Sequence, residues 1–585
     1  MNTTLSNPSL RSLGLVPSSS STSVESAISV VLTPSRTSGV APLAVHFDLT
    51  GTVGDNATEP FLELDYWADF DDPSGSFDGG NRGAVVSHVF DQPGTYHVAF
   101  YVRDILGNLA TRGVTITVTD PDTVFAGADT ICVATDGVFT GAPSGCTQVT
   151  SSDFDATVAS YLANGKRLLF KRGQTFTSSA TATIATTTAA ILGAWGTGGT
   201  VDERGIDSDA PIIQCAHDND LLNIGDHATT TECADLRIMD LECNYTNAGT
   251  AASMVAYDYR ADNVLIYRIS DGTGLFRNCV NLSTSVPDFY AIDPGALIFV
   301  ANCDFAGAGD YVWYAGGEKY SLLNSNLGNV TVQHVARMQW GTKLHIAGCT
   351  FGVPAASKHS LTVRAHDHTT DADDSRYVVI DGCSTTCGTV WAWHIGSEST
   401  GHDERVDDVL VTGCHFQFST GANNGYAIHT GSRRLTVSNC TMGANSGVGL
   451  TSCRFFFVDT YGLSGSQPAP EKIRCVHNTV TTLTTLSGNW RLVNGTAGDI
   501  EVRNNILYAP SAGSLTVTTG AATFTASNNL SGTNPSFVSP PADLHLQVGS
   551  AARDYGTPVA WALRDYDGTL RDFATSPDAG AFEYS

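Results

Sequence analysis

VVIDGCST, residues Val378–Thr385, is one copy of a short phrase that recurs through the second half of the chain. The other copies are LHIAGCTF (Leu344–Phe351), VLVTGCHF (Val409–Phe416), LTVSNCTM (Leu435–Met442), IRCVHNTV (Ile473–Val480), IEVRNNIL (Ile500–Leu507) and FTASNNL (Phe524–Leu530). Aligned on one position, they place Cys349, Cys383, Cys414, Cys440, Asn478, Asn505 and Asn529 at spacings of 34, 31, 26, 38, 27 and 24 residues. A repeat of this length, with alternating β-branched residues and then a tight turn, is typical of stacked coils. The phrase therefore predicts a parallel β-helix.

The order of residues within the phrase predicts which side chains lie inside. Val378 and Ile380 share one face of the strand, a turn at Asp381–Gly382 resets the alternation, and Cys383 points inward. Because coils stack at about 4.8 Å, equivalent residues should form ladders, first of thiols and then of asparagines that hydrogen-bond to one another. Two positions later we expect an interior apolar row, made of Phe305, Phe351, Phe416, Met442, Val480 and Leu507.

Weaker copies of the phrase come earlier in the chain. They are LRIMDLEC (Leu236–Cys243), VLIYRISD (Val264–Asp271), LIFVANCDF (Leu297–Phe305) and YSLLNSNL (Tyr320–Leu327). With these copies the chain resembles the right-handed, pectate-lyase-like β-helix proteins, and the resemblance and the crossover rule imply a right-handed rod. We expect the β-helix to occupy residues 212–535.

Residues 27–120 have the composition of a separate β unit. They contain APLAVHFDLTG (Ala41–Gly51), LDYWADFDD (Leu64–Asp72), VSHVFDQPGTYHVAFYVRDILGN (Val86–Asn108) and VTITVTD (Val114–Asp120). Alternating runs separated by Pro-Gly and Gly-Asn turns predict a β-sandwich. The unit resembles a PKD-type immunoglobulin-like domain, with departures at Ala68 and Asp71, and the resemblance implies a spacer or adhesion module. The predicted fold class is all-β, a β-sandwich followed by a parallel β-helix.

Three further segments complete the predicted organisation. Residues 1–26 form a polar arm, and they lack the basic start and apolar core of a signal peptide. Residues 121–211 form the start of the β-helix and its N-terminal cap, with a helical turn at Val158–Gly165. Residues 536–585 form a C-terminal strap. Within them Ala542–Ser585 contains DLHLQVGSAARDYG, DYDGTLRDF and SPDAGAFEY, and this combination resembles the closing segment of extracellular bacterial β-helix proteins, which implies a strap along the last coils. The polar arm suggests release by cell lysis, as for a virus of bacteria, or a signal removed from the sequence.

Composition excludes several classes of partner. With 31 basic and 58 acidic residues the net charge is −27, which argues against nucleic-acid binding because phosphates demand a basic surface. No apolar run is long enough to insert into a membrane. The 14 cysteines are too sparse for a disulfide scaffold, and Cys132 with Cys146 is the one pair that we expect to bond. Cys383 and Cys387 lack a second pair with zinc spacing, so we expect neither metal nor cofactor.

The strands that precede four copies of the phrase carry the candidate functional residues. They read ARMQWG (Ala336–Gly341), VRAHDH (Val363–His368), WAWHIG (Trp391–Gly396) and YAIHTG (Tyr426–Gly431). If apolar residues such as Met338 and Trp391 face the core, alternation places Gln339, His366, His394 and His429 in one row on the solvent side. Arg337 and Arg364 lie beside this row. A long polar face is how a solenoid binds an extended polymer, here a polysaccharide.

Two interpretations of this row remain open. In the first, His394 or a carboxylate acts as general base, and Asp367 with Glu398 supplies the two carboxylates, about 5–10 Å apart, that glycoside hydrolysis requires. Substrate binding would then fall to Arg337, Gln339, Arg364, His366 and His429, with arginine holding an acidic sugar. In the second, the row is a hydrogen-bonded stack that fixes the register. Trp391 and Trp393 are expected in the core, and as sugar platforms only if the alternation is inverted there.

Three functions are therefore compatible with the sequence. The first is a bacteriophage virion surface protein, of tailspike, receptor-binding or decoration type, which binds and in one version degrades cell-surface polysaccharide. It would be a homotrimer that contacts other virion proteins through residues 1–26. The second is a secreted bacterial polysaccharide lyase or hydrolase, and the third is a non-catalytic adhesin. The location is the virion surface or the extracellular space.

Overall fold

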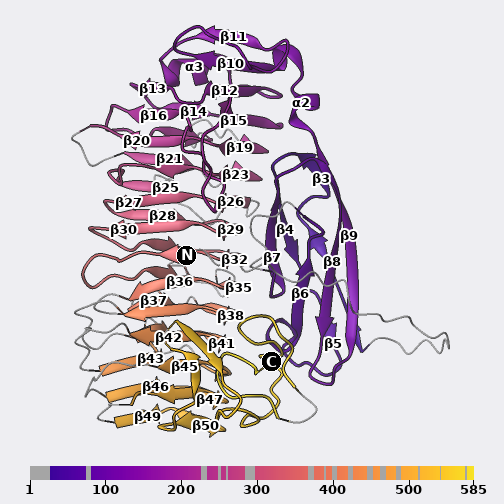
Figure 1. Ribbon diagram of the computed structural model, residues 1–585, viewed down its shortest axis with the longest axis vertical. Coiled ribbons are helices and arrows are strands. Elements are labelled where there is room, and N and C mark those ends of the chain that lie inside the picture. Colours follow the sequence, from indigo (N-terminus) through magenta and orange to yellow (C-terminus); the bar gives the residue numbers. More distant parts are fainter. Residues whose placement is uncertain are drawn as a thin grey trace, which may run out of the picture.

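The computed structural model (Figure 1) describes most of the chain. The described residues are 27–73, 81–225, 233–247, 252–257, 261–282, 297–365, 374–387, 391–397, 405–418, 426–444, 452–461, 469–481, 489–510, 514–540, 542–572 and 576–584. They form a rod of stacked coils, and an N-terminal sandwich lies along one flank of this rod. Within these residues no helix is long and apolar enough to cross a membrane.

Three parallel sheets run the length of the rod, which confirms the predicted fold class. Sheet 1 contains, in spatial order, β11 (Thr147–Thr150), β10 (Thr130–Ala134), β12 (Arg167–Lys171), β15 (Ala190–Trp195), β19 (Leu236–Met239), β23 (Val264–Tyr267), β26 (Leu297–Ala301), β29 (Lys319–Leu323), β32 (Lys343–Ala347), β35 (Ser375–Asp381), β38 (Val406–Thr412), β41 (Arg433–Ser438), β44 (Ile473–Val476), β47 (Asp499–Arg503) and β50 (Thr523–Ser527). Its strands from β19 onward are the copies of the sequence phrase, paired in the predicted order.

Sheets 2 and 3 complete each coil. Sheet 2 contains β13 (Thr175–Ser178), β16 (Ile212–Cys215), β20 (Glu242–Tyr245), β24 (Ser270–Asp271), β27 (Asp304–Ala308), β30 (Asn326–Val330), β33 (Thr350–Phe351), β36 (Ser384–Cys387), β39 (His415–Phe418), β42 (Thr441–Ala444), β45 (Thr479–Thr481), β48 (Ile506–Tyr508) and β51 (Leu530–Ser531). Sheet 3 contains β14 (Ala182–Ile184), β17 (Leu222–Ile224), β21 (Ser253–Tyr257), β25 (Asn278–Leu282), β28 (Tyr311–Ala315), β31 (Ala336–Met338), β34 (Leu361–Val363), β37 (Trp391–Ile395), β40 (Tyr426–Thr430), β43 (Ser452–Val458), β46 (Asn489–Gly495) and β49 (Ser514–Thr519).

The turn between sheets 1 and 2 explains the phrase. The residue before each ladder position has left-handed backbone, as at Gly382 (φ 62°), Asn439 (φ 55°) and Asn504 (φ 57°). Glycine and asparagine tolerate this conformation better than other residues, which accounts for their place in the phrase. The next residue then points inward, so Cys383 is buried and Asn505 is fully buried.

The two predicted ladders are both present. The Cys349 and Cys414 thiols donate to carbonyl oxygens of their own coils, at 3.2 Å to Ala347 and 3.2 Å to Thr412. In the asparagine ladder, Asn478 Nδ2 donates to Asn505 Oδ1 at 3.1 Å, and Asn505 Nδ2 donates to Asn529 Oδ1 at 2.8 Å. The predicted interior row is also buried: Phe305, Phe351, Phe416, Met442, Val480 and Leu507 all belong to one core cluster.

The N-terminal cap differs from its prediction. The helix is α3 (Phe154–Tyr161), which begins four residues before the expected Val158. Asp153 sets this start, since its carboxylate accepts a hydrogen bond from the Ala156 backbone N–H. Phe154 and Val158 pack into the end of the rod's core. Cys132 and Cys146 are both free thiols, so the expected disulfide is wrong.

The sandwich consists of two small sheets around its own core. One sheet contains β2 (Thr33–Pro34), β4 (Leu43–Asp48) and β7 (Val85–Phe90), and the other contains β3 (Ser38–Val40), β9 (Leu109–Thr119), β8 (Gly94–Arg103) and β6 (Asp65–Asp69). A short pair, β1 (Ile28–Ser29) with β5 (Val53–Gly54), and α1 (Pro60–Glu63) close its lower end, and α2 (Pro121–Val124) leads to the rod. Phe47 and Phe100 meet between the sheets, with ring centres 5.3 Å apart.

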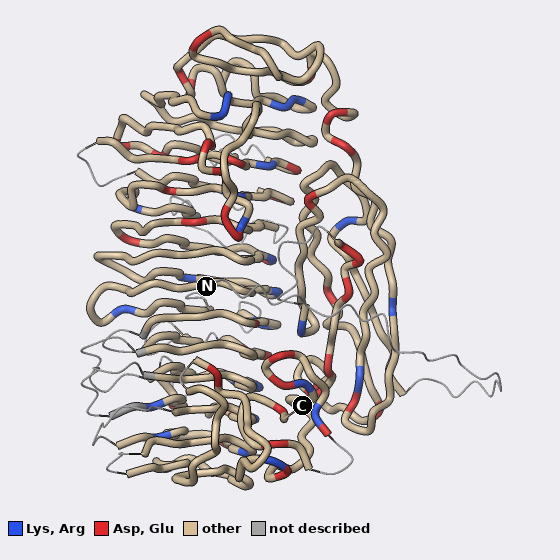
Figure 2. The backbone as a smooth tube through the Cα atoms, in the orientation of Figure 1, with Lys and Arg blue, Asp and Glu red and all other residues tan. Residues whose placement is uncertain are grey.

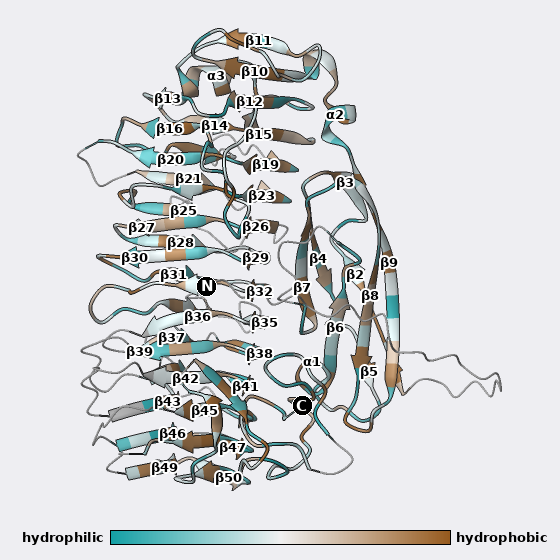
Figure 3. Cartoon of the chain, viewed as in Figure 1, coloured by the Kyte–Doolittle hydropathy of each residue, from teal (hydrophilic) through white to brown (hydrophobic). Residues whose placement is uncertain are grey.

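The sandwich docks against the outer face of sheet 1. Its strand β7 contacts β32 and β35, and α1 contacts β38 and β41. Val379 of the rod belongs to the sandwich's core cluster, and brown, hydrophobic stretches mark β4 and β7 beside sheet 1 (Figure 3). At the centre of the contact, the Ser87 backbone N–H donates to His345 Nδ1 at 2.9 Å. The sandwich therefore covers much of sheet 1.

Charges of opposite sign reinforce this contact. The rod contributes cations and the sandwich anions in the pairs Lys343–Asp48 (2.6 Å), Arg268–Asp91 (3.2 Å) and Arg474–Glu59 (2.8 Å). Basic segments lie at the coil edges that face the sandwich (Figure 2). One buried guanidinium, that of Arg237, donates to the carbonyl oxygens of Pro42 and Val40 at 3.1 and 3.0 Å. Two carbonyls of the sandwich thus depend on one rod side chain.

The C-terminal segment crosses the last coils. It includes β52 (Phe537–Ser539) and β53 (Asp543–Leu546), and its Leu544 and Phe582 pack with Ile506 of the rod. Arg564 of this segment pairs with Asp65 of the sandwich at 3.0 Å. The segment therefore contacts both the rod and the sandwich.

Candidate functional site

The outer face of sheet 3 carries aromatic side chains in register, some buried and some partly exposed. Each strand here bends at two consecutive core residues, for example Ala392–Trp393, Ala427–Ile428 and Phe455–Phe456. Side chains on either side of the bend, three residues apart, therefore both point outward. Strict alternation, on which the sequence prediction rested, fails at this bend.

The outward side chains form two rows along the rod, and we call the two rows together the aromatic face. The upper row comes before the bend in each strand, and the lower row comes after it. The upper row contains Tyr311, His334, His359, Trp391, Tyr426 and Arg454. The lower row contains Tyr314, Arg337, Thr362, His394, His429 and Phe457. Tyr461, which follows β43, lies over both rows, at Trp391 of the upper row and at His394 and His429 of the lower row.

The predicted row of Gln339, His366, His394 and His429 is wrong in its composition. His394 and His429 are neighbours, but Thr362 and Arg337 precede them in register, and Gln339 lies two residues beyond Arg337. The row is also not exposed, since His394 is 1% and His429 0% accessible.

The other predicted residues have mixed outcomes. Arg337 is half-buried on the aromatic face, whereas Gln339 and Arg364 are buried. His366, Asp367 and Glu398 lie outside the described residues. Trp393 is in the core as expected, but Trp391, expected beside it, faces outward and is only partly buried.

His394 and His429 are linked in a chain of hydrogen bonds that ends at a carboxylate. His394 Nε2 lies 3.0 Å from the Ser397 carbonyl oxygen, and its Nδ1 lies 2.9 Å from His429 Nδ1. His429 Nε2 lies 2.8 Å from Asp459 Oδ1, which also accepts the Tyr461 backbone N–H at 2.9 Å. Burial lowers the pKa of His394 well below its usual range, and the neighbouring His429 adds to this. His394 is therefore neutral.

Rings stack above this chain along the upper row. The His359 ring is parallel to Trp391 within 8°, with centres 5.4 Å apart, and Trp391 lies 3.8 Å from the His429 ring centre. His359 Nδ1–H donates to the Trp391 carbonyl oxygen at 3.0 Å. Burial lowers the pKa of His359 to about 4 and that of His334 to about 2. His359 is thus a neutral support for Trp391, and His334 is a neutral support for His359.

A cleft of about 220 Å³ opens at the N-terminal end of the aromatic face. Its lining residues are Arg277, Asn278, Asn281, Asp310, Tyr311, Tyr314 and Arg337. The two tyrosine rings are 5.2 Å apart, and the Arg337 guanidinium lies 5.6 Å from the centre of Tyr314. Arg277 pairs with Asp310 at 2.6 Å. Aromatic surface beside a few amide and charged groups is the composition of a small-ligand site.

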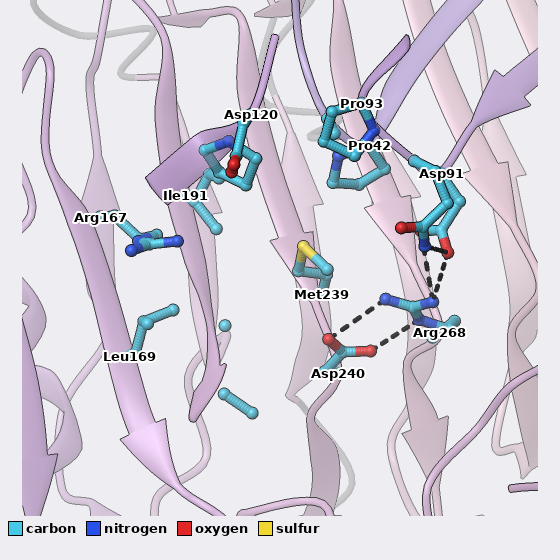
Figure 4. A pocket seen from close by; sticks show the side chains of 15 residues that line it. Pro42, Asp91, Pro93, Asp120, Arg167, Leu169, Ile191, Met239, Asp240 and Arg268 are labelled. Carbon is cyan, nitrogen blue, oxygen red and sulfur yellow. Dashed lines mark hydrogen bonds and ion pairs between the residues drawn. The ribbon is translucent and has the colours of Figure 1, made fainter. Parts of the chain in front are cut away.

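A cleft of about 490 Å³ lies between the sandwich and the rod (Figure 4). Its floor is apolar, with Leu169, Ile191 and Met239. On one side the Arg268 guanidinium is held between Asp240 and Asp91, and Asp240 also pairs with Arg172 at 3.4 Å, so these charges are engaged with one another. We assign this cleft to the contact between the two domains.

Comparisons with known proteins find similarity to solved structures. No protein-family model and no curated protein matches it. Among solved structures, a Yersinia enterocolitica family 28 exopolygalacturonase aligns with a TM-score of 0.36 and 10% identity, over 86% of this chain and 98% of that one. ORF18 of Geobacillus virus E2 aligns with a TM-score of 0.22 and 11% identity, over 62% of this chain and 54% of that one. This chain thus spans about half the length of the viral protein.

Asp459, Tyr461 and the tyrosine pair of the cleft were not predicted from the sequence. The spacing of the outward residues is nevertheless visible in the sequence, because they recur three positions apart, as in Tyr311/Tyr314, Trp391/His394 and Tyr426/His429. This spacing indicates outward side chains only because each strand bends between them. Asp459 and Tyr461 follow β43 and carry no repeat of their own.

Proposed function

We propose that this chain binds a polysaccharide along the aromatic face. The observation that carries the proposal is the register of the two rows, which align rings and polar groups from coil to coil at a spacing of about 4.8 Å. A repeating polymer can contact the partly exposed members of these rows along the rod; they are Tyr311, Tyr314, Arg337, Trp391, Arg454 and Phe457. Aromatic rings with polar edges offer both stacking area and hydrogen bonds.

The charge of the cleft favours an acidic polysaccharide. Its lining contains two arginines and one aspartate, although the whole chain has a net charge of −27. A guanidinium binds a carboxylate more strongly than it binds a neutral hydroxyl. The cleft would hold one acidic sugar, and the rings farther along would hold its neighbours.

The setting that we propose is the surface of a bacteriophage virion, with the rod as a host-attachment protein. Two features support this setting. The ladder uses cysteine as a thiol that donates hydrogen bonds to carbonyl oxygens, a role that fits folding in a reducing cytoplasm. The sandwich is held along the rod by paired charges, which would give a stiff attachment body.

Assembly belongs to the same proposal. We propose a homotrimer joined to other virion proteins through residues 1–26. Because the sandwich covers much of sheet 1, the rods would meet through other faces. The mass of the protein in solution tests the trimer, and a monomer mass at working concentration contradicts it.

The proposed function is tested by an array of bacterial surface polysaccharides and polygalacturonate. The wild type should bind acidic members, and Tyr461→Ala should lose that binding. Tyr161→Ala is the matched control, because Tyr161 is 37% exposed and Tyr461 42%, but Tyr161 lies on α3 away from the face. Equal binding by both variants would contradict the proposal. Release of reducing ends or unsaturated sugars from the bound polymer would add a lyase or hydrolase activity; intact polymer would leave an adhesin.

A further inference from the structure

The hydrogen-bond chain on the aromatic face contains an imbalance of protons. It joins the Ser397 carbonyl oxygen, His394, His429 and Asp459 through three contacts of 2.8–3.0 Å. A carbonyl oxygen and an ionised carboxylate only accept, so both ends of the chain are acceptors. Each contact needs one proton, three in all. Two neutral imidazoles carry only two N–H protons, one fewer than the three contacts require.

We infer that His394, His429 and Asp459 bind one additional proton, and that this proton makes the aromatic face a pH-gated binding surface. With the third proton all three contacts are complete. Without it, one of the three contacts, at 2.8–3.0 Å, places two acceptor atoms face to face in a buried site, which is repulsive and leaves polar groups unsatisfied. The pH dependence of ligand binding rests on the proposed function, whereas the presence of the additional proton does not.

The neighbours of the chain place the extra proton on His429. Its Nε2–H then donates to Asp459 and its Nδ1–H donates to the neutral His394. The Tyr461 backbone N–H donates to the same Asp459 oxygen and so favours the ionised carboxylate. Trp391 and Phe457 lie 3.8 and 5.0 Å from the His429 ring centre, and both offer aromatic faces to a cation.

Other titratable and charged groups around the chain oppose a charge on His394 instead. Among the described residues these are His359, whose ring centre lies 5.7 Å from that of His394, and Arg364, on the preceding coils. On the following coil the facing groups are Asp459 and the phenol of Tyr461. One cation, Arg364, therefore lies on the His394 side, where the neutral His359 adds no charge, and the anion lies on the His429 side.

Loss of the proton should change the positions of the Trp391 and Tyr461 rings. His429 supports Trp391, and Tyr461 lies 5.7–5.8 Å from the ring centres of Trp391, His394 and His429. When the His394–His429 contact opens, these rings lose their fixed position. Binding to the face should then weaken as the pH rises.

The test compares the wild type with Asp459→Asn between about pH 5.5 and pH 9, a range that brackets the ordinary histidine pKa of about 6.5. In Asp459→Asn an amide turned to donate its N–H to His429 Nε2 completes the three contacts with two neutral histidines, and the Tyr461 backbone N–H then loses its acceptor, because both groups meet the same atom of Asp459. The fluorescence of Trp391, isolated as the difference between each protein and its Trp391→Phe form, reports the opening without any ligand. It should titrate in the wild type and stay constant in Asp459→Asn.

Polygalacturonate binding is measured over the same range. Wild-type affinity should fall about tenfold as the pH rises, the factor that one ordinary hydrogen bond represents. Asp459→Asn should bind equally throughout. Asp567→Asn is the matched control, because it removes a different histidine–aspartate pair, that of Asp567 with His545 at 2.6 Å on the C-terminal segment. The Trp391 fluorescence of this control should titrate as in the wild type.

The outcomes separate the two proposals. If wild-type fluorescence is constant, or if Asp459→Asn titrates like the wild type, the extra proton is refuted. If the fluorescence titrates as expected but affinity does not change with pH, the gating is refuted. If no polysaccharide binds at any pH while Trp391 titrates as expected, the proposed function fails and the extra proton stands.

Discussion

Replacing His394 with alanine should destabilise the rod by about 2–6 kcal/mol. The side chain is 1% accessible, and both of its nitrogens are in hydrogen bonds, to the Ser397 carbonyl oxygen and to His429. Two lost hydrogen bonds contribute about 0.5–1.5 kcal/mol each, and a stranded buried nitrogen on His429 adds about 1–3 kcal/mol. The space left by the ring adds a smaller cavity term.

The assay is urea unfolding followed by far-ultraviolet circular dichroism, with polysaccharide binding measured in parallel on the folded protein. Tyr461→Ala is the reference, because this side chain is 42% exposed and its loss should cost under about 0.5 kcal/mol. His394→Ala should lose stability and weaken binding indirectly, through Trp391 and Tyr461. Tyr461→Ala should lose binding alone.

One result would refute this reasoning. If His394→Ala keeps the unfolding midpoint of the wild type and abolishes binding, His394 touches the ligand itself. The row would then act as an exposed, ligand-binding row of histidines, not as a hydrogen-bonded stack.

Three further changes test other parts of the fold. Asn505→Ala should cost about 3–5 kcal/mol in urea unfolding, because its amide joins Asn478, Asn529 and two backbone carbonyls; a loss below about 1 kcal/mol would contradict a structural ladder. Arg237→Ala should cost a similar amount and uncouple the sandwich from the rod, seen as two unfolding transitions where the wild type has one. Burial lowers the pKa of His46 to about 4, so the unfolded chain binds this proton first, and stability should fall by roughly 3 kcal/mol as the pH drops from about 6.5 to about 4. The His46→Gln protein should lack that part of the pH dependence, and an unchanged acid profile would contradict it.

The fold could be predicted because its signal is repeated. The phrase that ends in Cys383, Cys414 or Asn505 combines a strand, a left-handed turn and an inward residue, and each of these follows from local chemistry. Every copy adds an independent instance of the same pattern. The docking of the sandwich on sheet 1 could not be predicted this way, since contacts such as Arg237 with Val40 join residues that share no pattern.

The candidate site was predicted only in part, for a reason that lies in the bend of sheet 3. Alternation placed Trp391 inside and His394 outside as an exposed group. Two consecutive core residues, Ala392 and Trp393, turn both neighbours outward, and the packed rings then bury His394. Asp459 completes the chain from the coil that follows His429. It lies just after β43, where the sequence shows only a single aspartate.

The most direct test of the central claim is the structure of the protein with the oligosaccharide that the array selects. The aromatic face should carry the ligand, with one sugar in the cleft between Tyr311, Tyr314 and Arg337 and others against Trp391 and Tyr461. An oligosaccharide bound on sheet 2, on the sandwich or in the cleft at Arg268 would contradict the claim.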